Sequence, residues 1–390
     1  MTGNVILWFF IIILTILLIK QLNIKKNIII CILISMLIIL FILNIDQSIT
    51  AALEGCKLWY SAILPTTFPF LIICNLLISY DGISLYSKFL GPLICKPLGL
   101  SQNCSFPIVA SVLCGYPLGA KYCVNLYSMG YIEKDEYQRL LNIASNVGPL
   151  FLIGSVGTAI LGNVSFGYIL LVGNYISAII IGLITKKKRT NLISSSLRSH
   201  KSEKINFGLA IKNSVENAIN TIFSIGGFIV IFSVIISLVK NNHYVPIIFN
   251  QLEHILYLSS GTLYGLFLGS IEITNGCNIL SILQLSLPIK LGIISFLCSF
   301  SGLAIIAQVS SFVSETNINF GKYIFFKIVQ GIFSFIITYI LVKFLPASIA
   351  TSTLTLPIIP NPYVQLIPIL ALLVLTLLLE TINKLFFHTT

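Results

Sequence analysis

The stretch CGYPLGAKYC, Cys114–Cys123, interrupts an apolar run that is long enough to cross a membrane. It places two glycines, a proline and a lysine where a continuous membrane helix would carry aliphatic side chains. Proline removes a backbone donor and glycine permits unusual dihedral angles, so the stretch predicts a broken helix. Irregular backbone is tolerated at membrane depth only where protein or a water-filled cavity surrounds it. We therefore expect this break in the protein interior.

The composition around the break is that of a membrane protein. Of 390 residues, 56% are hydrophobic and 9% are charged, whereas soluble domains carry about 25% charged residues. Apolar runs recur from Val5 to Phe387, each about as long as the roughly 17–25 residues that span a bilayer. They lack the alternation of a transmembrane β-barrel. The sequence predicts an all-α polytopic protein in contact with the lipid bilayer.

The positive charge of the chain indicates its topology. The net charge is +11, and the lysines and arginines lie in particular loops rather than in a basic domain, so no nucleic-acid partner is expected. Lys20, Lys25 and Lys26 follow the first apolar run, so this first loop is expected in the cytoplasm and the N-terminus outside. The polar stretch from Lys186 to Lys204 is also expected in the cytoplasm, and the C-terminus then lies inside. Nine full crossings follow: Val5–Ile19, Asn27–Ile45, Tyr60–Tyr80, Asn142–Leu161, Phe166–Ile184, Ile211–Val239, Lys290–Phe312, Lys322–Leu345 and Tyr363–Ile382.

In this topology Ser105–Met129 must start and end on the same side of the membrane. A re-entrant hairpin with its tip near Gly115–Pro117 satisfies that condition. The second half of the chain repeats the plan, since FLIICNLLIS, GYPLG and SNVGPLFLIG fall opposite FIVIFSVIIS, EITNG and SFSGLAIIAQ in the same order. Such matches predict an internal repeat, and the topology makes the two repeats inverted, as in many secondary transporters.

The predicted organisation has five parts. They are an N-terminal transmembrane hairpin (1–46), a first repeat (47–185), a cytoplasmic connector (186–204), a second repeat (205–346) and a C-terminal transmembrane helix (347–390). Each repeat contains a re-entrant or broken-helix hairpin. Helices broken at matching places in both halves indicate a transporter binding site.

The first half-site centres on the opening stretch. The N-terminal end of a broken helix carries partial positive charge and suits an anion, and Lys121 adds a full charge beside it. The alternative is that Lys121 reaches toward the membrane interface while the glycines only pack helices. The predicted residues of this half-site are Gly115, Tyr116, Pro117, Gly119, Lys121, Ser145, Asn146, Gly148 and Pro149.

The second half-site contains a carboxylate, and an ionisable group inside a membrane is a functional candidate by default. Glu272 is expected to pair with Lys121, to accept a coupling proton, or to help hold a cation; the sequence leaves these alternatives and a plain structural ion pair open. The alternative for the serines and glycines is that they are small residues at tight helix crossings. The predicted residues are Glu272, Thr274, Asn275, Asn278, Ser299, Ser301 and Gly302, with Gln308 as a further buried amide.

Signatures of enzymes and bound cofactors are missing from the sequence. It contains no HExxH, GxSxG, P-loop or GxGxxG motif. The nine cysteines show neither metal-ligand spacing nor a disulfide framework. We expect a non-enzymatic protein without metal or cofactor, and the sequence does not indicate its oligomeric state.

Three motifs resemble a known family. GCKLWYSAILPTTFPFLIICNLLI, then CGYPLGAK, then SNVGPLFLIGSVG are similar to the YlbJ-type sporulation integral membrane proteins, also called SpoVV, within the wider group that carries nucleoside recognition or Gate domains. The likeness runs from about Ala51 to Leu345. It is weaker in the second half, where this chain has ITNG and SFSG.

The resemblance implies a protein of the outer forespore membrane that moves dipicolinic acid toward the developing spore. Dipicolinate is a small planar dianion and suits a cationic site. The Gate group also includes components of nucleoside carriers and of iron transport. The expected function is therefore transport of a small anionic solute, with a nucleoside or ion permease and a non-transporting sporulation scaffold as the alternatives.

Overall fold

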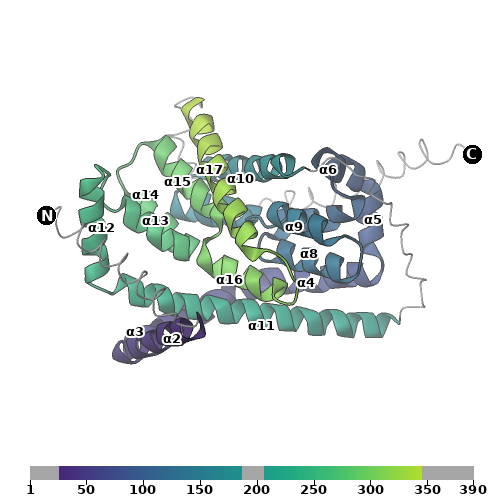
Figure 1. Cartoon of the computed structure of the whole chain (residues 1–390), viewed down its shortest axis with the longest axis horizontal. Helices are drawn as coiled ribbons and strands as arrows, with labels where there is room; N and C mark the ends of the chain where they lie inside the picture. Colours follow the sequence, from purple (N-terminus) through teal and green to yellow (C-terminus); the bar gives the residue numbers. More distant parts are fainter. Residues whose placement is uncertain (1–25, 187–205, 345–390) are drawn as a thin grey trace, which may run out of the picture. The chain divides into compact units, whose positions relative to one another are not determined.

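The structure is a computed structural model that describes residues 26–186 and 206–344, all within one compact unit, Met1–Thr351. The regular elements of these residues are all helices (Figure 1). The predicted spans Val5–Ile19 and Tyr363–Ile382 and most of the connector lie outside the described residues.

The first half of the chain consists of short helices followed by one long helix. Their bounds are α2 Lys26–Leu43, α3 Ile45–Leu58, the π-helix η1 Trp59–Ile63, α4 Leu64–Ser79, α5 Gly82–Phe89, α6 Gly91–Leu98, η2 Gln102–Cys104, α7 Ser105–Cys114, α8 Leu118–Ser128, α9 Lys134–Ile143, the π-helix η3 Leu150–Ile160 and α10 Val164–Ile184.

The second half begins with the longest helix of the described residues, which is 34 residues long. Its elements are α11 Phe207–Lys240, α12 Tyr244–Ile255, α13 Thr262–Ile271, α14 Ile273–Ile282, α15 Leu287–Phe300, α16 Gly302–Val313 and α17 Phe320–Phe344.

Four apolar stretches of the described residues are long enough to cross a membrane: Val164–Ile184, Phe207–Lys240, Leu287–Val313 and Phe320–Phe344. The number rises to six if two bent pairs each form one span, Asn27–Leu43 with Ile45–Ser61 (100°) and Thr67–Ser79 with Gly82–Phe89 (86°). Asn142–Leu161, expected as one crossing, is divided because α9 ends at Ile143 and η3 starts at Leu150. The prediction of nine crossings is therefore not confirmed.

Helix α11 lies along the first half of the chain. It contacts α3 and α4, which come from far earlier in the sequence (Figure 1). The indole nitrogen of Trp59 donates a hydrogen bond to the carbonyl of Ile222 at 3.0 Å. Gly55 of α3 lies against Ser233 of α11, where a larger residue would collide. Small residues of this kind permit close helix approach in membrane proteins.

Helices α10, α15 and α17 pack together through buried polar side chains. Ser295 of α15 is central, since its hydroxyl lies 2.6 Å from that of Ser334 and accepts hydrogen bonds from Thr338 at 2.8 Å and Asn174 at 3.2 Å. Ser299 donates to the amide oxygen of Asn174 at 2.6 Å. Hydrogen bonds between such side chains hold helices together in an apolar surrounding, where unsatisfied groups are costly.

The two halves present their elements in a similar order. In the first half α4 is followed by the interrupted pair α7–α8, the interrupted pair α9–η3, and the long helix α10. In the second half α11 is followed by α13–α14, α15–α16 and the long helix α17. The predicted breaks are thus present in both halves, while the inversion of the repeats remains a prediction.

Candidate functional site

The opening stretch contains the break that its sequence predicts. Helix α7 ends at Cys114 and α8 begins at Leu118, and the two helices pack against each other. Gly115 has φ +77°, a conformation that side-chain-bearing residues rarely adopt, and the peptide bond between Tyr116 and Pro117 is cis. No side chain caps the start of α8. The structure thus contains the predicted break, whereas the re-entrant hairpin in the membrane remains a prediction.

The second break of the first half lies directly against the first. Residues Ser145–Gly148, which have no regular secondary structure, separate α9 from η3. A Cβ added at Gly115 would collide with the backbone of Gly148. A Cβ at Gly119 would likewise overlap the carbonyl oxygen of Ala144. The amide of Asn146 donates to the Ser111 hydroxyl at 3.2 Å. Pro149 comes immediately before η3. Of the nine predicted residues of this half-site, all but Lys121 therefore lie in or next to the two breaks that cross here.

The carboxylate of Glu272 caps the helix that begins after the third break. Glu272 has extended backbone between α13 and α14 and accepts hydrogen bonds from the amides of Thr274 at 2.9 Å and Asn275 at 3.0 Å. The Asn275 side chain adds a third donor at 2.8 Å. A negative group that accepts these bonds stabilises a helix N-terminus. The helix end proposed to receive an anion is therefore occupied in this half by Glu272.

The fourth break lies beside the third. Ser301 and Gly302 both have positive φ, +77° and +69°, between α15 and α16. A Cβ added at Gly302 would lie 3.2 Å from the carbonyl oxygen of Ile271 and 3.3 Å from that of Gly269. The two interruptions of the second half thus meet, as those of the first half do. Asn278 is exposed one turn further along α14 and does not join them.

Contacts between the halves bring the two crossings together. The Tyr116 hydroxyl donates to the carbonyl of Cys298 on α15 at 3.2 Å. Tyr116, Val147, Ile273 and Cys298 belong to one apolar cluster, which joins the two breaks of the first half to α14 and α15. The sequence prediction that GYPLG and EITNG form parts of one region agrees with this packing.

Lys121 bonds to a residue other than Glu272, the partner considered for it from the sequence. Its ammonium donates to the hydroxyl of Thr221 on α11 at 2.5 Å. Glu272 is held by α14, so no Lys121–Glu272 pair forms in the described residues. Near Glu272, the side-chain oxygen of Asn275 accepts a hydrogen bond from the ammonium group of Lys240, at the end of α11, at 3.2 Å. Lys121 is partly buried, and the alternative that it reaches toward the membrane interface remains a prediction.

The structure adds a buried lysine that the sequence reasoning missed. Lys327 of α17 is 1% exposed and donates to the carbonyl of Ser145 at 2.7 Å and to the side-chain oxygen of Gln330 at 2.8 Å. Gln330 in turn donates to Asn146 at 3.0 Å, and the hydroxyls of Tyr323 and Ser145 lie 2.8 Å apart. The sequence does contain a signal for this residue. Lys327 interrupts the apolar run of α17, and a charged residue inside a membrane span is a functional candidate by default.

Two polar groups predicted from the sequence are buried without a hydrogen bond. They are the Ser301 hydroxyl, in a residue with no exposed surface, and the side-chain oxygen of Gln308, in a residue that is 3% exposed. Ser301 lies near the Tyr323 hydroxyl but does not meet hydrogen-bond geometry with it. Buried polar groups are normally paired, so unpaired ones beside a chain break are candidate ligand contacts.

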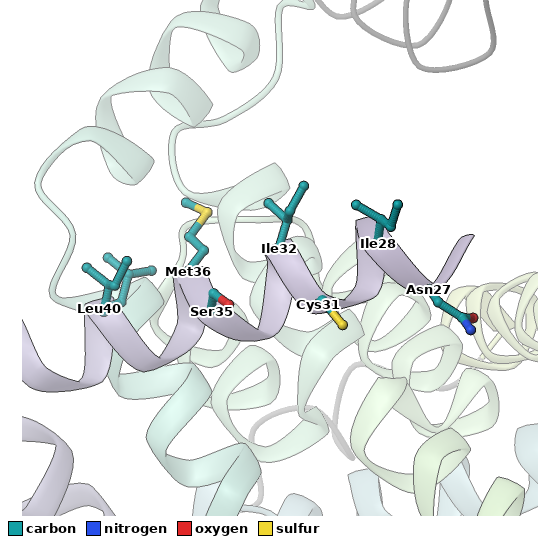
Figure 2. Close-up of a pocket in the computed structure, with 8 residues that line it drawn as sticks. Asn27, Ile28, Cys31, Ile32, Ser35, Met36 and Leu40 are labelled. Atoms are coloured by element: carbon teal, nitrogen blue, oxygen red, sulfur yellow. The ribbon is translucent and has the colours of Figure 1, made fainter. Parts of the chain in front are cut away.

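A hollow in the described residues lies away from these breaks. It has a volume of about 630 Å³ along α2, where Ile28, Ile32 and Met36 point to the same side (Figure 2). All the residues that line it belong to α2. An apolar face of this kind is expected to contact lipid, so the hollow is not part of the candidate site. The described residues contain no cluster of three or more His, Cys, Asp or Glu that could hold a metal ion.

These features define a class, namely an all-helical integral membrane protein whose interrupted helices meet in its interior. No family model matches the chain. The chain is 25% identical over 319 residues to the sporulation integral membrane protein YlbJ of Bacillus subtilis (strain 168), across 76% of this chain and 78% of that protein. This similarity confirms the resemblance to YlbJ-type sporulation membrane proteins.

A solved structure of CNTnw in an outward-facing state is also similar. It has a TM-score of 0.40 and 15% sequence identity, and the match covers 76% of this chain and 83% of that one. A TM-score at this level is below that of chains with a common fold, and the similarity supports no conclusion about this protein.

Proposed function

We propose that the chain is a membrane transporter of a small anionic solute, which binds where the interrupted helices meet. The observation that carries this proposal is the pairwise meeting of four chain breaks, Gly115 against Gly148 and Gly302 against the carbonyls of Gly269 and Ile271. Discontinuous helices that meet inside the bundle form the substrate sites of many secondary transporters. Alternating movement of the two halves around this region would expose the site to one side at a time.

The particular solute we propose is dipicolinate, moved across the outer forespore membrane. The similarity to a sporulation membrane protein supports a role in spore formation. The resemblance in GYPLGAK and SNVGP implies dipicolinate as the solute. Two buried or partly buried lysines, Lys121 and Lys327, supply positive charge near the breaks, which suits a dianion. A coupling proton or cation remains part of the expected mechanism.

Uptake by the purified full-length chain in liposomes tests this proposal. We expect accumulation of labelled dipicolinate, reduced by excess unlabelled dipicolinate but not by nucleosides. Inhibition by nucleosides instead would indicate a nucleoside permease. A protein that takes up neither solute but whose loss still blocks sporulation would support the scaffold alternative and contradict transport.

Lys121 needs a matched comparison because it also bonds to Thr221. We expect Lys121→Ala to abolish dipicolinate uptake without loss of protein, whereas Thr221→Val, which removes the same hydrogen bond but keeps the charge, should retain most of it. Equal losses in the two variants would show that Lys121 serves only to hold α8 against α11.

A further inference from the structure

Lys327 lies deep within a candidate membrane span. It is the eighth residue of the 25-residue helix α17, which places it about 10 Å from the start of the helix at 1.5 Å per residue. Its side chain is 1% exposed, so it does not extend to the interface as long basic side chains near helix ends do. The charged group is therefore enclosed by protein.

The contacts of this lysine are neutral. Its two hydrogen-bond acceptors are the carbonyl of Ser145 and the amide oxygen of Gln330. No carboxylate of the described residues lies within 4.0 Å of its Nζ atom. An enclosed charge without an opposite partner is costly, and in membrane proteins such groups mark substrate or ion pathways. The negative partner is thus missing from the surrounding protein.

Hydrogen bonds fix the side chains around the Lys327 Nζ atom, and one donor hydrogen of its ammonium group has no acceptor among the described residues. Gln330 is fixed by Asn146 at 3.0 Å, and Tyr323 by Ser145 at 2.8 Å. An ammonium has three donor hydrogens, of which the two contacts above use two. The Ser301 hydroxyl, near Tyr323, is fully buried and has no hydrogen-bond partner. One ammonium donor and one hydroxyl therefore remain available beside the first-half break.

We propose that Lys327 is the residue that binds a carboxylate group of the transported solute, with the Ser301 and Tyr323 hydroxyls beside it. The inference rests on the proposed transport function and refines it, because it adds a carboxylate contact on α17 to the charge that Lys121 supplies on α8. A carboxylate supplies the missing opposite charge and accepts charge-assisted hydrogen bonds. A cation is disfavoured at this position, since the ammonium group of Lys327 is itself positive.

Binding to the full-length chain in lipid nanodiscs tests the assignment. The probes are dipicolinate and pyridine-2,6-dicarboxamide, which has the same ring and a similar shape but no charge. The preference is the ratio of the dissociation constant of the dicarboxamide to that of dipicolinate. We expect wild-type protein to prefer the dianion, and Lys327→Met to reduce this ratio about 10- to 100-fold, as for a hydrogen bond to a charged group. Lys327→Arg, which keeps the charge, should retain part of it.

The matched control is Lys322→Met, because Lys322 is exposed on the same helix and its loss changes the net charge equally. The preference should then stay within about twofold of wild type, since exposed charges are screened. An unchanged preference in Lys327→Met would overturn the inference and leave Lys327 as a structural link between α17 and the Ser145 carbonyl. Size-exclusion profiles verify that each variant is folded.

Further outcomes separate this inference from the proposed function. If dipicolinate does not bind, then picolinate, benzoate and succinate are each compared with their amides, and failure of the wild type to prefer any carboxylate overturns the inference. Carboxylate preference that depends on Lys327, without uptake into liposomes, supports the binding site and contradicts transport. If Lys327→Met does not fold, Ser301→Ala takes its place, with carboxylate binding at least threefold weaker expected and unchanged binding contradicting the proposal.

Discussion

Two glycines, Gly115 and Gly119, allow the two chain breaks of the first half to lie in contact. Gly119 faces the carbonyl of Ala144 and the side chain of Ser111 so closely that no Cβ fits between them. Gly115 combines a similar approach to Gly148 with a positive φ of +77°. At these two positions the absence of a side chain is a requirement of the packing, not merely an aid to helix flexibility.

We expect Gly119→Ala to destabilise the protein, because the new methyl group would overlap backbone atoms that cannot move freely. Overpacking of this kind costs about 1–3 kcal/mol or more. Gly227→Ala on α11 is the control, since nothing lies within 4 Å of its added Cβ and alanine favours helix. Thermal unfolding in detergent measures both, and an unchanged midpoint for Gly119→Ala would contradict the close crossing.

At the scale of the element, Glu272 illustrates how one side chain can stabilise an interrupted helix. Its carboxylate accepts from two amides at the start of α14 and from the Asn275 side chain. The sequence offered three functional roles for this carboxylate, and the structure adds a fourth, that of an N-terminal cap. A cap satisfies backbone donors that the break would otherwise leave free.

A cap and a substrate contact respond differently to substitution. Glu272→Ala should lose about 0.5–2 kcal/mol of stability, whereas Glu272→Asp, which keeps a capping carboxylate, should lose less. If capping is the main role, dipicolinate uptake per folded molecule remains near wild type in Glu272→Asp. Loss of uptake in Glu272→Asp with normal thermal stability would instead assign Glu272 to the solute or the coupling ion.

For the whole molecule, the similar order of elements in the two halves is the feature of most consequence. Each half contains a leading helix (α4 or α11), two interrupted pairs and a final long helix, and the breaks of the two halves come together through Tyr116 and Cys298. Rocking of one half against the other would act on this region directly. The orientation of the halves in the membrane is the part of the proposal that labelling can test.

The hairpin topology predicts that Lys96 and Glu133 lie on the cytoplasmic side, and that His243, after α11, lies on the opposite side. Single cysteines at these positions, with the exposed Cys31 and Cys56 replaced, can be labelled with an impermeant maleimide. We expect the first two to react from the same side and the third only from the other. Reaction of Lys96→Cys and Glu133→Cys from different sides would show that α7 and α8 cross the membrane.

Much of the fold was predictable from local chemistry. The composition indicates a helical membrane protein, and the breakers at Gly115–Pro117, Ser145–Pro149 and Ser301–Gly302 mark interruptions that the structure contains. Proline and glycine act on the backbone at their own position, so their effect can be read from sequence. Whether a predicted span is one straight helix was harder to predict. The bend between α4 and α5, for example, depends on the helices that pack beside it.

The partners of the charged side chains required the folded chain. Sequence placed Lys121 and Glu272 in one site, but Lys121 bonds to Thr221 and Glu272 caps its own helix. Lys327 is separated from Ser145 by 182 residues, and no local pattern indicates that α17 crosses the first-half break. Sequence thus determines where the backbone breaks, since that is a local property. Only packing brings distant segments together, and it therefore decides which charge lies at the breaks.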